Sequence, residues 1–311
     1  MKLLIIGAGA MGSLFAGRLQ AKTEDVFLYN RQNAHVDKIM QNGLTIVERD
    51  NQETTIPLTV VHEVTHHSYD LVLVMVKTHA TQTALAPLAH SFSTETVFVT
   101  LQNGLGNVET IQTIFPHNPV VAGTMGCGAS VECAGRILHR GWGTNYIGRA
   151  ATGAAQEKLV NFCQLLNQAG LETELAEDVQ AVIWNKLFVN LVYNSLTALT
   201  RLRNGAILTT DDGQQLVRSI VMEAAEVAKA EGVRVDTEQL IATCIQMGQE
   251  QFPENKSSML MDVLMKRKTE IDSINGAVAR LGKQHQIATP TNDLITGIIK
   301  VIEANYDHQV N

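Results

Sequence analysis

The chain has 311 residues, of which 45% are hydrophobic and 18% are charged. This length is typical of about two domains, and the apolar content is ample for their cores, which excludes an extended or disordered chain. The formal net charge of −7 argues against nucleic acid and anionic membranes as main partners, because both select basic surfaces.

Cysteine usage and the distribution of apolar residues indicate the compartment. Four cysteines occur without a CxxC pair, which favours reduced thiols in a cytoplasm. The apolar start MKLLIIGAGAMG is too short for a signal peptide and contains a glycine cluster where such a peptide would continue. No run of about 18 apolar residues predicts a membrane span. We therefore expect a cytoplasmic protein.

The first half of the chain alternates β-rich runs with helical stretches. The continuous Val- and Ile-rich runs lie at residues 2–7, 25–30, 70–77, 96–104 and 119–126. Such runs are typical of doubly buried strands in a parallel sheet. Residues 44–61 alternate and turn at Asp50–Asn51, which predicts an antiparallel hairpin inserted in that sheet. With further strands expected at 135–140 and 145–150, this half is predicted to be an α/β domain.

From about residue 155 the chain carries helical periodicity. The periodic segments lie at 157–170, 178–202, 213–232, 237–250, 258–286 and 291–308. Because the first of them resembles the last crossover helix of the sheet, we place the domain boundary near residue 172. The prediction is an α/β Rossmann-type dinucleotide-binding domain at 1–172 and an all-α domain at 173–311.

The segment GAGAMG at 7–12 fits the G-x-G-x-x-G pattern in the context that makes it specific. It follows a predicted strand and opens a predicted helix. The first glycine permits the tight turn, the second lets the backbone approach a pyrophosphate, and the third lets helix and strand pack closely. We predict that the loop binds the cofactor through Gly7, Ala8, Gly9, Ala10, Met11 and Gly12.

The end of the second strand indicates which dinucleotide is preferred. Enzymes that prefer NAD place an acidic residue there, on the ribose hydroxyls. Here the strand ends in Tyr29, Asn30 and Arg31. An arginine pairs with a 2′-phosphate that a carboxylate would repel. We therefore predict NADPH, with Arg31 as a cofactor-binding residue; the alternative is a surface arginine without that role.

Two other patterns stand out. The segment HEVTH at 62–66 matches a zinc-protease motif, but that motif requires a long helix. These residues fill a short polar connection, so we predict no metal. In VIWNKLFVNLVYNSL at 182–196, polar residues recur every fourth position in an apolar run. Lys186, Asn190 and Asn194 therefore share one helix face, and buried polar groups need partners.

Together these features resemble the ketopantoate reductases (2-dehydropantoate 2-reductases) over nearly the whole length. The motifs that carry the resemblance are GAGAMG, Arg31, VKT at 76–78, LQNG at 101–104, KLFVNLVYNSLTAL at 186–199, Asn204–Gly205, and SSMLMDVLMKRKTEIDSINGAV at 257–278. The family reduces ketopantoate to (R)-pantoate with NADPH, on the route to pantothenate and coenzyme A. The resemblance implies this reaction on a small 2-oxo acid in a cleft between the domains, and a homodimer.

The resemblance also implies roles for residues of the polar stripe. Lys186 matches the catalytic general acid, which protonates the developing alkoxide. Asn190 and Asn194 match substrate-binding asparagines, and amides donate and accept without adding charge. Asn204 matches another substrate contact, although Asn–Gly is equally a helix stop. Ser195 is a departure, because the family often has proline there.

Further positions follow from the same resemblance. Glu270 matches the active-site glutamate, which would orient Lys186 or bind the nicotinamide ribose; Asp272 is the weaker choice. Ser258 matches a serine that holds the substrate carboxylate, although serine is also a good N-cap. The remaining matches are Asn103 for nicotinamide and substrate at a strand end, Lys77 for the cofactor, and Ala129 for a backbone contact to the cofactor.

Two other functions stay open. One is a related 2-oxo acid reductase or D-2-hydroxyacid dehydrogenase that acts on another branched or aromatic substrate, in some cases with NADH. Arg31 argues against the NADH-using type. The other is a non-catalytic dinucleotide sensor. Such a protein would have lost Lys186 or Glu270, and both are present.

Overall fold

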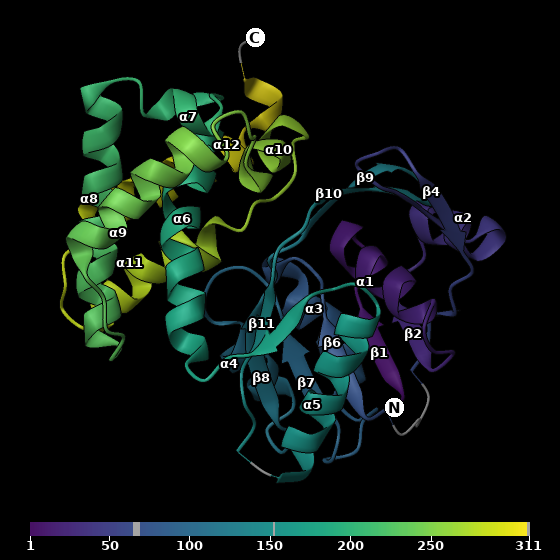
Figure 1. Ribbon diagram of the computed structural model, residues 1–311. Coiled ribbons are helices and arrows are strands. Elements are labelled where there is room, and N and C mark those ends of the chain that lie inside the picture. The colour runs from purple at the N-terminus through teal and green to yellow at the C-terminus, as the bar shows by residue number, and fades with distance from the viewer. Residues whose placement is uncertain (65–68, 152, 310–311) are drawn as a thin grey trace. The chain divides into compact units, whose positions relative to one another are not determined.

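The computed structural model describes residues 1–64, 69–151 and 153–309. The chain forms two compact units, which Figure 1 shows as a sheet-containing part and a helical part. Unit 1 comprises Met1–Gln102 and Asn107–Val182, and unit 2 comprises Asn103–Gly106 and Ile183–Asn311. The predicted fold class, an α/β part followed by a helical part, is confirmed.

Unit 1 is built on an eight-stranded sheet with the order β12-β11-β8-β7-β6-β1-β2-β5. All neighbours are parallel except β11 and β8. The strands are β1 (Leu3–Ile6), β2 (Val26–Tyr29), β5 (Val60–Val61), β6 (Leu71–Val74), β7 (Val97–Thr100), β8 (Val120–Thr124), β11 (Asn145–Ile147) and β12 (Thr173–Leu175). Because β12 belongs to this sheet, unit 1 extends past the predicted boundary at residue 172.

Both faces of this sheet are covered, as the continuous apolar runs predict. Successive side chains of β1 alternate between the faces: Leu3 and Ile5 join one core cluster, and Leu4 and Ile6 join the other. The first cluster includes α1 (Ala10–Gln20) and α5 (Gly153–Gln168), and the second includes α3 (Thr81–Leu85), η2 (Ala86–Leu88) and α4 (Asn107–Ile114). The buried sheet is therefore a rigid support for the loops at its carboxyl edge.

A second sheet of four strands corrects one expectation. The predicted hairpin forms, with β3 (Leu44–Val47) antiparallel to β4 (Glu53–Ile56). It is not inserted in the main sheet. It pairs with β10 (Arg136–Gly141), which pairs with β9 (Gly128–Cys133), in the order β4-β3-β10-β9. A core of Leu14, Ile39, Leu44, Ile46 and Ile137 holds this sheet against α1 and α2 (Ala34–Asn42).

Unit 2 is the helical part of the chain (Figure 1), and most apolar side chains of α6 are buried in its core. The helices are α6 (Val179–Thr200), α7 (Asn204–Ile207), α8 (Asp211–Ala230), α9 (Thr237–Gln246), α10 (Ser258–Leu264), α11 (Asn275–Gln284) and α12 (Pro290–Ala304). A π-helical segment, η3 (Met247–Gln251), follows α9, and 3-10 helices lie at η4 (Ile271–Ser273) and η5 (Tyr306–His308). No helix in the described part of the chain is long and apolar enough to span a membrane.

The expected helix over 258–286 is broken. It divides into α10, a loop from Met265 to Glu270, η4 and α11. Lys266 has a positive φ of 52°, a conformation that an α-helix does not contain. The helix start is also shifted by one residue, since the Ser257 hydroxyl accepts the N-cap bond from Leu260 N–H. Ser258 is therefore the first helical residue and not the N-cap.

Candidate functional site

The glycine loop connects β1 to α1 with the geometry that a pyrophosphate requires. Gly7 has φ of 113°, and a Cβ there would lie 2.8 Å from Val76. A Cβ on Gly12 would lie 1.8 Å from the carbonyl oxygen of Gly7, so helix and loop pack without room for a side chain. A Cβ on Gly9 meets nothing within 4 Å. Gly9 is the N-cap of α1 with no side-chain cap, so this helix end faces open space, which suits an anion.

The residues after β2 lie beside this loop. Asn30 Oδ1 accepts a hydrogen bond of 3.0 Å from Ala8 N–H, and its Nδ2 donates to Arg31 O at 2.7 Å. The Asn30 side chain therefore braces the glycine loop. Arg31 itself is exposed. Its guanidinium is an accessible cation where an NAD-selective enzyme would present a carboxylate.

The remaining predicted cofactor residues of unit 1 come from two different sheets. Lys77 is exposed and follows β6 at its carboxyl end, where ligands of such sheets bind. The buried Gln102 side chain donates to Val76 O at 2.6 Å and to Thr81 Oγ1 at 2.8 Å, so it ties the end of β7 to the Lys77 loop. Ala129 lies in β9 of the small sheet, opposite His139.

In unit 2 the predicted polar stripe forms on α6. Lys186 and Asn190 are half-buried, whereas Asn194 is only 5% exposed. Their spacing of four residues places them on one helix face. The neighbouring positions Leu187, Phe188 and Leu191 are fully buried in the helical core. The core therefore fixes the rotation of α6 about its axis, and with it the direction of the stripe.

Asn103 and Glu270, 167 residues apart, meet in unit 2. Asn103 Nδ2 donates to Glu270 Oε2 at 3.4 Å, and Glu270 is 6% exposed. Leu105 N–H donates to Ser273 O at 2.8 Å. A Cβ on Gly104, which has φ of 80°, would lie 2.2 Å from Ser273 O, so only glycine permits this approach. The LQNG loop thus docks on the turn that presents Glu270.

Three other predicted positions in unit 2 have different surroundings. Asn204 begins α7, is 5% exposed, and its buried Oδ1 has no hydrogen-bond partner in the described part of the chain. A buried acceptor of this kind needs a donor. Ser258 is exposed. Asp272 pairs with Lys300 at 2.5 Å and lies half-exposed, so it is engaged outside the site.

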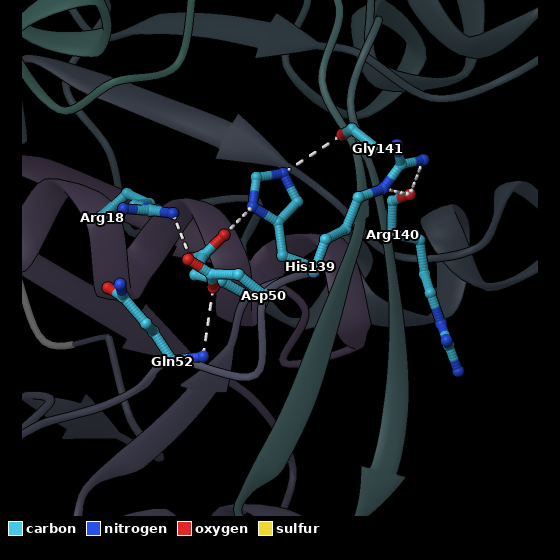
Figure 2. A network of polar contacts seen from close by, with 8 residues as sticks. Arg18, Asp50, Gln52, His139, Arg140 and Gly141 are labelled. Carbon is cyan, nitrogen blue, oxygen red and sulfur yellow. Dashed lines mark hydrogen bonds and ion pairs between the residues drawn. The ribbon is translucent and has the colours of Figure 1, made fainter.

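The small sheet is fixed to α1 by a polar network (Figure 2). His139 of β10 is 2% exposed; its Nδ1 lies 2.9 Å from Glu48 Oε2 and its Nε2 lies 3.1 Å from Gly141 O. The other Glu48 oxygen pairs with Arg18 of α1. Trp142 packs on both, with the His139 ring centroid at 4.0 Å and Arg18 at 5.3 Å. This network holds β9, and so Ala129, against α1.

Among the described residues, no group of three His, Cys, Asp or Glu side chains could hold a metal. Of the HEVTH segment, His62 directs Nδ1 to Asn30 O at 3.0 Å, whereas Thr65 and His66 lie outside the described residues. The candidate groups therefore form two sets, one in each unit. Unit 1 has a glycine loop with a geometry that suits phosphates, and unit 2 has a lysine, several amides and a carboxylate, which suit proton delivery to a polar substrate.

Comparison with known proteins identifies one family over both units. Residues 3–152 match the family model described as ketopantoate reductase PanE/ApbA, and residues 178–303 match its C-terminal counterpart. A 2-dehydropantoate 2-reductase from Halobacterium salinarum is 31% identical over 304 residues, which cover 97% of this chain and 99% of the relative.

Among the solved structures that resemble the whole chain are two with TM-scores of 0.91 and 0.89. One is D-mandelate dehydrogenase with NADH and anilino(oxo)acetate, which has 27% identity and a TM-score of 0.91 over 99% of this chain and 100% of that one. The other is a PanE/ApbA family ketopantoate reductase from Ralstonia eutropha, with 27% identity and a TM-score of 0.89 over the same shares of the two chains.

Proposed function

The chain belongs to the ketopantoate reductase PanE/ApbA family, and from this premise we propose that it reduces ketopantoate (2-dehydropantoate) to (R)-pantoate with NADPH. The family consists of oxidoreductases that use nicotinamide cofactors. The observation that carries the proposal is the set of polar groups in unit 2: the Lys186–Asn190–Asn194 stripe on α6, and Glu270 held by Asn103.

We assign the cofactor to unit 1. The open space at Gly9, the free N-terminus of α1 and the exposed Arg31 support binding of a pyrophosphate and a 2′-phosphate. When bound, NADPH supplies the hydride. Lys77, Asn103 and the backbone at Ala129 complete the proposed contacts to the cofactor, and Glu270 is proposed to contact its ribose.

The substrate groups are assigned to unit 2. Lys186 Nζ donates a proton to the oxygen of the C2 carbonyl as that oxygen gains negative charge. Asn190, Asn194 and Asn103 bind the polar groups of the substrate. The unpaired Oδ1 of Asn204 is suited to accept a hydrogen bond from the substrate hydroxyl. Ser258 is assigned to the substrate carboxylate, which requires that a ligand reach its exposed position.

The resemblance to D-mandelate dehydrogenase with NADH favours one rival function, the reduction of an aromatic 2-oxo acid with NADH. The two functions differ in what the site must recognise. Ketopantoate has a terminal hydroxyl that needs a hydrogen-bond partner, whereas an aromatic substrate needs only an apolar pocket. A buried acceptor at Asn204 would remain unsatisfied with an aromatic substrate, at a cost of about 1–3 kcal/mol.

A substrate panel tests the proposal. The purified protein is assayed with ketopantoate, with 3,3-dimethyl-2-oxobutanoate, which lacks only the hydroxyl, and with phenylglyoxylate, each with NADPH and NADH. We expect kcat/KM for ketopantoate to exceed that of the deoxy analogue by about a hundredfold or more, because a site built for a hydroxyl rejects an analogue without it. Faster turnover of phenylglyoxylate would establish the rival, and no turnover of any acid would refute both.

The cofactor preference has its own test. Arg31→Ala should weaken NADPH binding by about tenfold or more and leave NADH binding nearly unchanged, because only NADPH has the phosphate that pairs with a guanidinium. Equal losses for both cofactors in equilibrium titrations would contradict this assignment. Lys38→Ala, which removes another exposed cation from the following helix, is the control and should change neither affinity.

We also propose that the protein is a cytoplasmic homodimer that associates through α12. Leu294, Ile298 and Val301 are 64%, 41% and 62% exposed, and their spacing places them on one face of this helix. A stripe of exposed apolar side chains favours contact with another apolar surface. The same stripe on a second copy fulfils this requirement by twofold symmetry. The four cysteines, all within the described residues, form no disulfide, which fits a reducing compartment.

A further inference from the structure

A chain of buried amides reaches α6 between its two proposed substrate asparagines. Asn275, at the start of α11, is fully buried, and its Nδ2 donates to Leu191 O of α6 at 3.2 Å. The same nitrogen donates to Asn292 Oδ1 of α12 at 3.0 Å. Leu191 lies in the turn between Asn190 and Asn194. Asn275 therefore touches the backbone that positions both, although no substrate role is assigned to it.

The orientation of Asn275 is determined by its partners. A carboxamide nitrogen has two hydrogens, and here each faces an acceptor, one on Leu191 and one on Asn292. Exchanging oxygen and nitrogen would place Oδ1 against two acceptors. Asn292 is fixed in the same way, since its Nδ2 donates to Ile220 O at 3.4 Å and to Glu223 Oε2 at 2.8 Å. The chain of bonds can run in one direction only.

The far end of this chain is anchored at α12. Glu223 of α8 accepts from the backbone N–H of Thr291 at 2.8 Å and of Asn292 at 3.0 Å, in the first turn of α12. Orphan N–H groups at a helix start are thereby satisfied by a carboxylate, which the helix dipole also favours. Asn275 is thus held from a rigid point, and its contact with α6 is not an accident of a mobile side chain.

The carbonyl of Leu191 receives a second side-chain donor. Ser195 Oγ donates to it at 2.5 Å from one turn along α6. Side-chain donors that join a helix carbonyl draw it outward, lengthen its helical bond and bend the helix. Two such donors therefore meet on one carbonyl midway along the polar stripe, the point at which a bend changes how Lys186, Asn190 and Asn194 are spaced.

We propose that Asn275 is a positioning residue for the reaction: through Leu191 O it sets the bend of α6 that aligns Asn190 and Asn194 for the 2-oxo acid. The identity of the substrate in this inference rests on the proposed function. The effect of Asn275 on the position of Asn190 and Asn194 does not depend on it. Asn275 contacts neither substrate nor cofactor in this scheme. It acts on binding of the acid, and binding of the nicotinamide cofactor in unit 1 is unaffected.

The test compares Asn275→Ala with Asn292→Ala. Both variants remove hydrogen bonds of a buried side-chain amide and should lower thermal stability similarly. Only Asn275→Ala removes the donor to Leu191 O. We expect Asn275→Ala to raise KM for the 2-oxo acid by about tenfold with a smaller change in kcat, and to leave the NADPH dissociation constant unchanged. Asn292→Ala keeps this donor and removes only its anchor, so KM should rise by no more than about twofold. Equal KM changes in both variants, or none in either, overturn the proposal.

Two further measurements make the result independent of folding defects and of the substrate assignment. Ser195→Ala removes the other donor from the same carbonyl with minimal loss of volume, and should raise KM by about threefold. The side-chain amide resonances of Asn190 and Asn194 in the free protein should shift in Asn275→Ala and Ser195→Ala, and by a smaller amount in Asn292→Ala, which keeps both donors to Leu191 O. If the unmodified protein reduces no 2-oxo acid, the proposed function fails, and these shifts alone decide the positioning role; unshifted resonances refute it.

Discussion

Glu270 shows how a single carboxylate is placed by groups far away in the chain. Its carbonyl accepts from Ser273 N–H at 3.1 Å and from Ser273 Oγ at 2.9 Å, which closes the turn that presents the side chain. Asn103 then contacts the carboxylate. A carboxylate fixed in this way needs no reorganisation when it meets a substrate or a cofactor. In the proposed reaction, this preorganisation is what the position of Glu270 contributes.

Lys186 is the residue whose removal should be most costly. Lys186→Ala should lower kcat by about two orders of magnitude or more, because no other proposed substrate contact in α6 is an acid. NADPH binding should be unchanged. Asn185→Ala, at the adjacent exposed position of the same helix, is the matched control and should retain full activity. Steady-state kinetics measure both, and turnover retained by Lys186→Ala would disprove its role as the proton donor.

His35 gives the fold a dependence on pH. Gly135 N–H donates to His35 Nδ1 at 3.0 Å, so His35 must be neutral there and offers its Nε2 hydrogen to Ser13 Oγ, 3.1 Å away. Burial lowers the pKa of His35 from 6.5, against a backbone hydrogen bond to Cys133 that raises it. The native state therefore binds fewer protons than the unfolded chain between the lowered pKa and 6.5.

The sign of the effect follows from that difference. The contribution of His35 to stability is complete above pH 6.5 and is lost as the pH falls through the lowered native pKa. Urea unfolding between about pH 7.5 and pH 5 should show this loss. His35→Gln keeps one acceptor and one donor but does not titrate, so its free energy of unfolding should fall less over this range. Parallel pH profiles for the two proteins would count against the assignment.

Among the elements, the glycine loop allows binding and folding to be separated. Gly9→Ala places a methyl group in open space where the pyrophosphate approaches. It should leave the melting temperature unchanged and weaken NADPH binding by about tenfold or more. Gly12→Ala drives a methyl group onto Gly7 O, 1.8 Å away, and should destabilise the protein by about 3 kcal/mol. Calorimetry and cofactor titration distinguish the two; a destabilised Gly9→Ala would contradict the assigned geometry.

Local sequence patterns predicted the elements that form largely independently of distant parts of the chain. The buried strands, the glycine loop and the long helices follow from hydrophobic period and turn chemistry, and they are present. The placement of the β3–β4 hairpin was predicted wrongly, because its neighbour β10 lies about ninety residues away and register between distant strands leaves no local signal. The break after Leu264 was missed because residues 258–286 keep a helical period across it.

The candidate site divides in the same way. The stripe on α6 and the glycine loop are sequence-local, so spacing alone indicated them. Gln102 and Ser273 were not singled out, since their contacts connect loops that are remote in sequence. The Ser257 N-cap was assigned one residue too late, as two adjacent serines are equivalent until tertiary contacts decide. The hydrogen bond of 2.6 Å between Thr197 Oγ1 and Ser257 Oγ favours Ser257 as the N-cap.

For the molecule as a whole, substitutions in the exposed apolar stripe of α12 test the proposed dimer. The double variant Leu294→Glu and Val301→Glu places two charges on the proposed contact and should convert a dimer to monomers in sedimentation experiments, because desolvating unpaired charges is costly. Val131→Glu, an exposed apolar position of β9 in unit 1, is the control and should remain dimeric. A wild-type monomer at micromolar concentration would refute the dimer.

The four residues Asn103–Gly106 determine whether the two units can be exchanged separately between related proteins. They belong to unit 2, yet Gln102 before them and Asn107 after them belong to unit 1, and the chain crosses again between Val182 and Ile183. No single cut therefore separates the two units. Consider a hybrid that joins the first 182 residues of this chain to the helical half of a relative. Its loop Asn103–Gly106 would come from one parent, and the turn at Ser273 that this loop contacts would come from the other. Recombination within such a family must transfer both pieces together or lose the support of Glu270, the proposed active-site glutamate.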